Sequence, residues 1–533
     1  MNNSRLLRGL APSAILLFLA AGLCQVVGCS GSQQSEPAEG AGQGRSARAS
    51  SPPEDRAEQT AVPTTPPAVK DKKDKYEPLF VDWPQPQLTL LITGRQHGYI
   101  EPCGCTGLEN MKGGLSRRHT LLGRLVERGW RPVAIDVGNQ VRRIGRQAEI
   151  KYQTTIDGLK KIGYQGIGYG PDDLRLAGTE LYLATLGDGK PAPLVCANAS
   201  VLGQTPSLRT FRVGEKKIGI TSILGAAQQK VIASKDIELS SPDEALARVV
   251  PKLQAEQCDL LILLAHASLE ESKRLAKKFP HFDIVVTAGG ATGPPRQPEK
   301  IAGTGTTLLQ VGEKGMYAGV VGVYDDPDQK LRYQRVPLDG RFADSKPMIA
   351  LLASYQAQLE ALGLEGLTIR PLPHPSGHGF AGTESCAECH TEAYKVWKNT
   401  PHAHATDSLV HPRERDMPRH FDPECLSCHV TGWNPREYFP YKTGYLGLES
   451  TPKLHNVGCE NCHGPGAEHV AAENGDVDLS EEQIETLRQQ LRLPLESAER
   501  NCLLCHDLDN SPDFHVKGAF RRYWRKVKHK GMD

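Results

Sequence analysis

The spacing of hydrophobic residues divides the chain into regions of different character. Between residues 86 and 345, short apolar runs alternate with longer amphipathic stretches. The apolar runs fall at 88–93, 133–137, 260–265 and 284–288, and amphipathic stretches fall at 115–129 and 242–254. Runs of the first kind are typical of buried strands, and stretches of the second kind are typical of helices with one packed face. Their alternation predicts a layered α/β domain. Later runs at 307–310 and 317–324 indicate a second sheet packed against the first.

The start of the chain has the layout of an export signal. Arg5 and Arg8 precede an apolar run that ends in Val26-Val27-Gly28-Cys29. The run is too short and too often interrupted to span a membrane. Its end resembles a bacterial lipobox, in which the signal is cleaved before a lipidated cysteine. We expect residues 1–28 to be a lipoprotein signal peptide and Cys29 to carry lipid, with a plain secretory signal as the alternative. Both place the mature protein in the periplasm or cell envelope.

Residues 29–85 are rich in Ser, Gly, Pro, Gln, Glu and Ala. Such a segment buries too little apolar surface to offset its ordering entropy, so we expect a disordered Pro/Ser-rich tether to the membrane. The whole chain has 63 Lys and Arg against 62 Asp and Glu, a net charge of +1. This balance argues against a nucleic-acid partner. The unusual counts are 14 cysteines and 18 histidines.

The pattern Cys-x-x-Cys-His occurs four times near the end of the chain. The copies, numbered here as the first to fourth motif, are Cys386-Ala-Glu-Cys389-His390, Cys425-Leu-Ser-Cys428-His429, Cys459-Glu-Asn-Cys462-His463 and Cys502-Leu-Leu-Cys505-His506. Two thiols at this spacing can bond to the two vinyl groups of one haem, and the adjacent histidine can bind the iron. Zinc sites and disulfide frameworks do not need a histidine after every second cysteine. We therefore expect four haem c groups and four proximal histidines.

Residues 381–533 contain few long apolar runs of their own. Four porphyrins would supply much of the interior, so we expect a mainly α-helical, haem-packed cytochrome domain that is unfolded without haem. Residues 346–380 begin with helical spacing and continue with Pro371, Pro373 and Pro375. This stretch is expected to be a connecting helix and hinge.

Three segments of the C-terminal region resemble the tetrahaem cytochrome c554 family of ammonia oxidisers. They are residues 397–403, 457–469 with Cys-Glu-Asn-Cys-His-Gly-Pro-Gly, and 523–529. The resemblance implies that His402, His469 and His529 are distal iron ligands.

Two further histidines remain as alternatives for the distal positions. His404 could replace His402. Three distal ligands for four haems would leave the iron of the second motif with a different or vacant sixth position, which the neighbouring His420 could fill.

The loops after the predicted strands resemble the calcineurin-like metallophosphoesterases and their 5'-nucleotidase branch. That family begins with Asp-x-His-Gly and Glu-Pro, where this chain has Arg95-Gln96-His97-Gly98 and then Glu101-Pro102. The histidine is kept, but Arg95 stands in place of a metal ligand.

The later loops of that family are altered as well. Its Gly-Asp becomes Gly138-Asn139, its Gly-Asn-His-Glu loop becomes 168–172 without the ligand or the catalytic histidine, and its Gly-His-x-His loop becomes 289–292. His266 survives. A dinuclear site needs several hard ligands, so the resemblance implies the metallophosphoesterase-like sandwich without its hydrolytic chemistry.

Cys103 and Cys105 directly follow the first altered loop. With His97 and His266 they could hold one soft metal ion, or they could form a redox pair. A structural pair, bridged to Cys196 or Cys258, is the third interpretation.

The function that these patterns favour is electron transfer to redox partner proteins through four haems, without catalysis. Two enzymatic alternatives stay open. One haem with an open site could reduce a small molecule such as a nitrogen oxide, or the middle domain could hydrolyse phosphoesters.

Overall fold

The computed structural model describes residues 76–533 apart from 103–106, 187–190, 414, 509 and 531–533. The expected signal peptide, Cys29 and most of the tether therefore lie outside the described residues, as do Cys103 and Cys105. The described residues belong to one compact unit, Asp71–Asp533.

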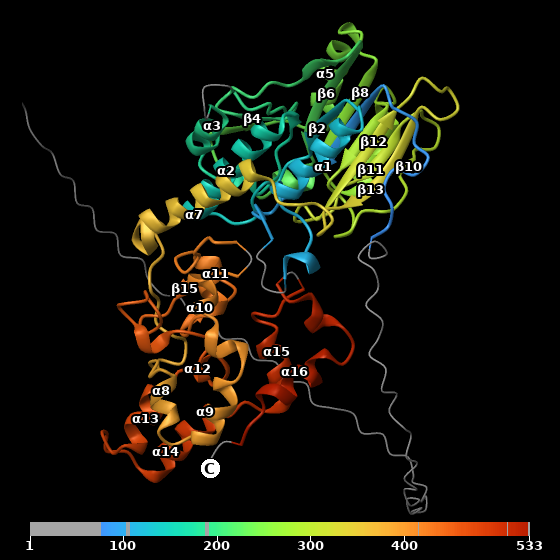
Figure 1. The fold of residues 1–533 in the computed structure, drawn as a ribbon. Helices are drawn as coiled ribbons and strands as arrows, with labels where there is room; N and C mark the ends of the chain where they lie inside the picture. Colours follow the sequence, from blue (N-terminus) through green and yellow to red (C-terminus); the bar gives the residue numbers. More distant parts are fainter. Residues whose placement is uncertain (1–75, 103–106, 187–190, 414, 509, 531–533) are drawn as a thin grey trace, which may run out of the picture. The chain divides into compact units, whose positions relative to one another are not determined.

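Two mixed sheets form the centre of the α/β domain (Figure 1). The five-stranded sheet has the order β13-β12-β1-β2-β3, with β13 Leu331–Pro337, β12 Tyr317–Val323, β1 Leu88–Thr93, β2 Pro132–Asp136 and β3 Tyr164–Ile167. The six-stranded sheet has the order β10-β11-β9-β8-β6-β5, with β10 Glu299–Lys300, β11 Thr307–Gln310, β9 Ile284–Thr287, β8 Leu260–His266, β6 Lys216–Leu224 and β5 Arg209–Val213. A small pair joins β4 Ala199–Val201 to β7 Ile237–Leu239.

The strand pairing explains how the two sheets arise. β1, β2 and β3 run parallel, as do β6, β8, β9 and β11. The layered α/β prediction is confirmed. The expectation that 307–310 and 317–324 together build the second sheet is wrong, because β11 pairs with β9 whereas β12 pairs with β1.

Helices cover the outer face of each sheet. They are α1 Leu115–Glu127, α2 Arg146–Ile162, α3 Gly178–Leu186, α4 Ala226–Gln229, α5 Pro242–Ala255, α6 Leu269–Lys278 and α7 Lys346–Gly366, with 3-10 turns at Leu108–Asn110 and Asp173–Arg175. In β8, Leu260, Ile262 and Leu264 face the apolar layer between the sheets. The alternate residues Leu261 and Leu263 face α5 and α6, as the two-residue period of a strand requires.

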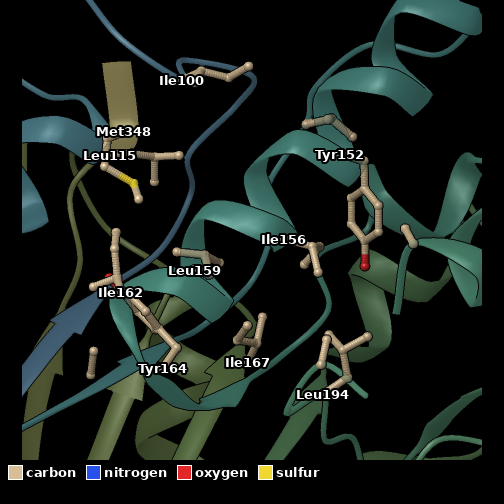
Figure 2. Close-up of a cluster of buried hydrophobic side chains, with 14 of the residues drawn as sticks. Ile100, Leu115, Tyr152, Ile156, Leu159, Ile162, Tyr164, Ile167, Leu194 and Met348 are labelled. Atoms are coloured by element: carbon tan, nitrogen blue, oxygen red, sulfur yellow. The ribbon is translucent and has the colours of Figure 1, made fainter. Parts of the chain in front are cut away.

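Helices α1, α2 and α7 share one apolar cluster with the five-stranded sheet. Figure 2 shows Leu115 of α1 and Met348 of α7 close together, with Leu159, Ile156 and Tyr152 at successive positions along α2 in the same cluster. The expected connecting helix, α7, therefore packs as part of the α/β domain.

Residues before the expected domain boundary are also packed. Phe80 is buried, and its ring lies edge-on to Trp83 and Trp130. Packed structure thus begins within the last residues of the expected tether.

The C-terminal region is built from short helices, which confirms the mainly α-helical prediction. Its elements are α8 Thr383–Ala387, α9 Thr391–Lys398, α10 Asp407–Val410, α11 Pro423–His429, α12 Cys459–His463, α13 Ala467–Glu473, α14 Glu481–Gln490, α15 Leu495–Cys502 and α16 Ala519–Val527, with the strand pair β14 Trp433–Asn434 and β15 Phe439–Pro440. Short 3-10 turns lie at Pro401–His404, Pro452–Leu454 and Pro512–His515. Within the described part of the chain, no helix is both long and apolar enough to cross a membrane.

Candidate functional site

The four cysteine motifs lie in or beside short helices of the C-terminal region. The second and third motifs occupy α11 and α12. The first motif begins in α8 and the fourth begins at the end of α15.

Cysteines of different motifs lie next to one another. The thiol of Cys386 in the first motif is hydrogen bonded to that of Cys459 in the third, and this contact, with burial, raises the pKa of Cys386. Cys428 of the second motif makes the same kind of contact with Cys505 of the fourth. The structure therefore brings the first motif to the third and the second to the fourth.

Three of the four proximal histidines have a hydrogen-bond partner at Nδ1. Nδ1 of His429 donates to the carbonyl oxygen of Ala405 at 2.8 Å, and Nδ1 of His463 donates to that of Leu491 at 2.7 Å. Nδ1 of His506 lies 3.0 Å from the Ser511 hydroxyl. A partner at Nδ1 fixes the ring and leaves Nε2 as the nitrogen that can bind a metal.

The expected distal histidines lie opposite proximal ones. The ring centres of His402 and His506 are 6.0 Å apart, and those of His463 and His529 are 5.7 Å apart. The pKa of His469 is lowered chiefly by burial and in part by the neighbouring His390. Each expected distal histidine is thus close to a different proximal one.

The alternative histidines are placed differently. His404 is exposed, and the ring of His420 lies edge-on to Phe421. His455 and His515 each use Nε2 to donate to a carbonyl oxygen, at 3.0 and 2.9 Å. Among the described residues, no ring contact pairs a histidine with His429.

The second candidate site is formed by the loops that follow the parallel strands of the α/β domain. Three non-glycine residues in these loops have positive φ angles, namely Arg95 at 51°, His97 at 55° and Asn139 at 68°. Gly138, at 99°, leaves no room for a side chain, because a Cβ atom there would overlap the backbone of Tyr169. Strained loops of this kind are common at functional sites.

The carboxylates of these loops are occupied by protein donors. Asp136 accepts hydrogen bonds from the Thr93 hydroxyl at 2.5 Å, the Gly138 amide at 2.8 Å and the Gln140 side chain at 2.7 Å. Asn139 and Asp172 bond to each other twice, at 2.9 and 3.0 Å. Oxygens that already accept these bonds are poorly placed to ligate a divalent ion.

Positive charge further disfavours a metal at this place. Arg95 is paired with Glu313. Burial, followed by the charges of Arg95 and Arg142, lowers the pKa of His97 to about 3. Burial also lowers the pKa of His266 to about 4, and its Nδ1 lies 3.3 Å from the Val137 carbonyl oxygen.

Of the expected soft-metal site, the structure describes His97 and His266, because Cys103 and Cys105 lie outside the described residues. Cys196 and Cys258, the proposed bridging partners, are free thiols. In the part of the chain that the structure describes, no group of three or more His, Cys, Asp or Glu side chains could hold a metal ion.

Two residues that shape these sites were not predicted from the sequence. Asp173 is fully buried and accepts hydrogen bonds from the backbone amides of Asn139, Gln140, Val141 and Gly170, at 2.7 to 3.1 Å. It follows Asp172, which lies in a loop that the family resemblance singles out. Nothing in the sequence around Asp173 distinguishes a buried carboxylate from an exposed one.

Asp422 is a second missed residue. Its position before Pro423 is a pattern typical of a helix start, and the structure shows it as the N-cap of α11, the helix of the second motif. That signal was available in the sequence.

Comparison with known proteins separates the same two regions. The family model described as cytochrome c554 and c-prime matches residues 385–464, which contain the first three motifs. Cytochrome c-554 of Nitrosomonas europaea is 37% identical over 97 residues, or 16% of this chain and 39% of that protein. The C-terminal resemblance is confirmed.

The middle region matches a different group of proteins. Apyrase of Aedes aegypti is 23% identical over 316 residues, covering 52% of this chain and 56% of that protein. The crystal structure of a 5'-nucleotidase precursor from Thermus thermophilus matches with a TM-score of 0.44 and 19% identity over 52% of this chain and 59% of that chain. The chain thus spans well under two thirds of the length of these relatives.

Proposed function

We propose that this chain is an exported tetrahaem c-type cytochrome that transfers electrons between redox partner proteins, with a non-hydrolytic α/β domain. The observation that carries the proposal is the set of four Cys-x-x-Cys-His motifs, three of whose histidines lie close to a second histidine. Bound haem would supply one-electron chemistry at each iron.

The histidines of the C-terminal region fit haem at three of the four motifs. Bonds between histidine nitrogen and a metal are about 2 Å long, so two imidazoles on opposite sides of one metal have centres about 6 Å apart. The pairs His402–His506 and His463–His529 meet this spacing. Together with His469 near His390, they would hold three of the irons.

Contacts between the motifs support transfer within the domain. The first and third motifs touch through Cys386 and Cys459, and the second and fourth touch through Cys428 and Cys505. Haem groups attached at these neighbouring thiols would lie close together, which short-range electron transfer requires.

A pyridine haemochrome assay on the full-length protein, purified from a host that attaches haem, tests the proposal. We expect four haem c groups per chain. Cys459→Ser with Cys462→Ser should give three, whereas Cys196→Ser, outside the motifs, should still give four. A count of four in the double variant would contradict the assignment.

The axial ligands can be tested one at a time. His469→Ala should convert one low-spin haem to high spin in the electron paramagnetic resonance spectrum. His404→Ala, which removes an exposed histidine two residues from His402, should leave the spectrum unchanged. An unchanged spectrum in His469→Ala would remove His469 from the proposed ligands, and a changed spectrum in His404→Ala would add His404 to them.

A second candidate function is the reduction of a small molecule at the haem of the second motif. The observation that favours it is His429: among the described residues no histidine ring makes a ring contact with it, and His402, on whose pKa its charge acts, lies 6.0 Å from His506. Turnover of a nitrogen oxide by the reduced protein, lost on His429→Ala, would support this activity. Absence of turnover would leave electron transfer as the only proposed function of the haem groups.

We propose that the α/β domain does not hydrolyse phosphoesters, because Arg95 and the occupied carboxylates oppose binding of two divalent ions. A phosphodiester assay of the full-length protein with added Mn²⁺ should show no turnover above the blank. Turnover that is lost on His266→Ala would overturn this conclusion.

The envelope location and the lipid at Cys29 are also part of the proposal. Mass spectrometry of the mature N-terminus should show cleavage before Cys29 and a diacylglyceryl mass on it. Cys29→Ser should release the protein from membranes. An unmodified N-terminus would indicate the plain secretory signal.

A further inference from the structure

The segment that leads into the second motif is hydrogen bonded to the α/β domain. Asp422 caps α11 by accepting from the Glu424 amide at 3.0 Å. Its carboxylate also accepts from the side chains of Gln147 in α2 at 2.9 Å and Gln356 in α7 at 3.0 Å. Asp422 is 4% exposed, so these bonds are shielded from water and fix the start of α11 to two helices of the other domain.

A pair of cations from the α/β domain faces the next acidic residue. Glu424, directly before Cys425, forms ion pairs with Lys151 at 2.5 Å and Arg143 at 3.0 Å. The guanidinium of Arg143 also lies over the ring of Tyr438, 3.2 Å from its centre. Burial raises the pKa of Glu424, but the charges of Lys151 and Arg143 outweigh it and lower the pKa.

The same segment is fixed at a second point. Arg415 bonds to Asp344 at 2.7 Å and lies 3.4 Å from Glu101. Met417 is buried in the apolar cluster of the α/β domain, and Phe421 packs against that cluster. Residues 415–424 are therefore held along their length, which places the second motif in a constant position relative to Lys151.

The burial of Lys151 makes its charge effective. Its side chain is 10% exposed, and charges interact several times more strongly away from water than in it. Removing one partner of such a pair leaves the other uncompensated. A positive charge near an iron favours the reduced state, which carries one more electron, and an unpaired negative charge disfavours it.

We propose that the α/β domain sets the reduction potential of the haem attached to Cys425 and Cys428, through the ion pair between Lys151 and Glu424. The inference rests on the proposed haem binding. It gives the α/β domain a function in this chain that does not need hydrolytic chemistry.

Spectroelectrochemical titration of the full-length holoprotein tests the inference. Lys151→Met should lower the reduction equilibrium constant of one of the four haems about tenfold, which is 59 mV for one electron, and leave the haem count at four. The control is Lys161→Met, which removes an exposed lysine from the same helix and should leave the reduction potentials of all four haems unchanged. A variant with both Cys425 and Cys428 changed to Ser lacks the second haem and identifies its step.

A double-mutant cycle guards against loss of folding in the first variant. Glu424→Gln should move the same step to higher potential, and the combined variant should return close to wild type. The inference is overturned if Lys151→Met moves no step, moves all four, or matches Lys161→Met. A wild-type count other than four overturns the proposed function instead, which keeps the two failures distinct.

Discussion

The α/β domain and the C-terminal region differ in what fills their interiors. Three clusters of buried apolar side chains lie on and between the two sheets. The described C-terminal residues share one small cluster of buried side chains, namely Phe380, Leu409, Leu426, Val430, Trp433, Tyr445 and Leu454. In place of a larger core, thiols and imidazoles of different motifs face one another. One region is held by its own side chains, and we expect the other to need bound haem for its structure.

The largest expected effect comes from withholding haem. Full-length protein made without a haem-attachment system should keep its α/β domain folded and lose the structure of 381–533, because the region has little apolar surface to bury. Limited proteolysis should then leave a stable fragment that ends near residue 380. Equal resistance of both regions would remove the distinction between them.

A substitution between the sheets should have the next largest effect. Leu264 is fully buried in the apolar layer between them, so Leu264→Ala should lower the free energy of unfolding of the α/β domain by about 3 to 4 kcal/mol. Urea unfolding followed by far-ultraviolet circular dichroism measures this loss of unfolding free energy. Leu183→Ala, at a side chain that is 57% exposed, should have little effect, and the haem spectrum should be unchanged in both.

A pH effect should follow from a carboxyl group buried where the two regions meet. Burial, against the attraction of Arg415, raises the pKa of Glu101 from 4.5 to about 7. The folded state then binds this proton more tightly than the unfolded state, so the stability that Glu101 contributes is fully present below pH 4.5 and is lost as the pH rises through 7. The fall is at most about 3 kcal/mol.

Urea unfolding at pH 5 and pH 8 measures this contribution. Wild type should lose more stability over this interval than Glu101→Gln, whose side chain does not titrate. Parallel losses in the two proteins would show that Glu101 is ionised in the folded state throughout.

The smallest effect is expected at a surface ion pair. Lys216 and Asp325 are 3.2 Å apart, and the Asp325 side chain is 66% exposed. Asp325→Asn should change the free energy of unfolding by less than about 0.5 kcal/mol. A loss as large as that of Leu264→Ala would show that charge at the surface, rather than apolar burial, holds this domain.

The sequence was most informative where local pattern decides structure. The runs that became β1, β8 and β9 were predictable because buried strands need apolar residues over their whole length. The split of 307–310 and 317–324 between two sheets was not predictable, because both runs have the same local pattern and differ only in the distant strands with which they pair.

The same limit applies to the sites. The spacing within each motif predicts where haem attaches, and a resemblance predicts His402 as a ligand. Only the structure brings His402 to His506, about a hundred positions further along the chain. The contact of Lys151 with Glu424 has no local signature at all. Tertiary contacts between polar residues cannot be inferred from one residue's neighbours in the chain.

The positive φ angles at Arg95, His97 and Asn139 have a consequence for protein engineering. The main chain of these loops has bends that cost about 1 kcal/mol or more at each such residue. A designer who wished to install a new catalytic site on this domain would start from loops whose backbone is already bent in this way. The work would lie in choosing side chains, since the bends are already in place.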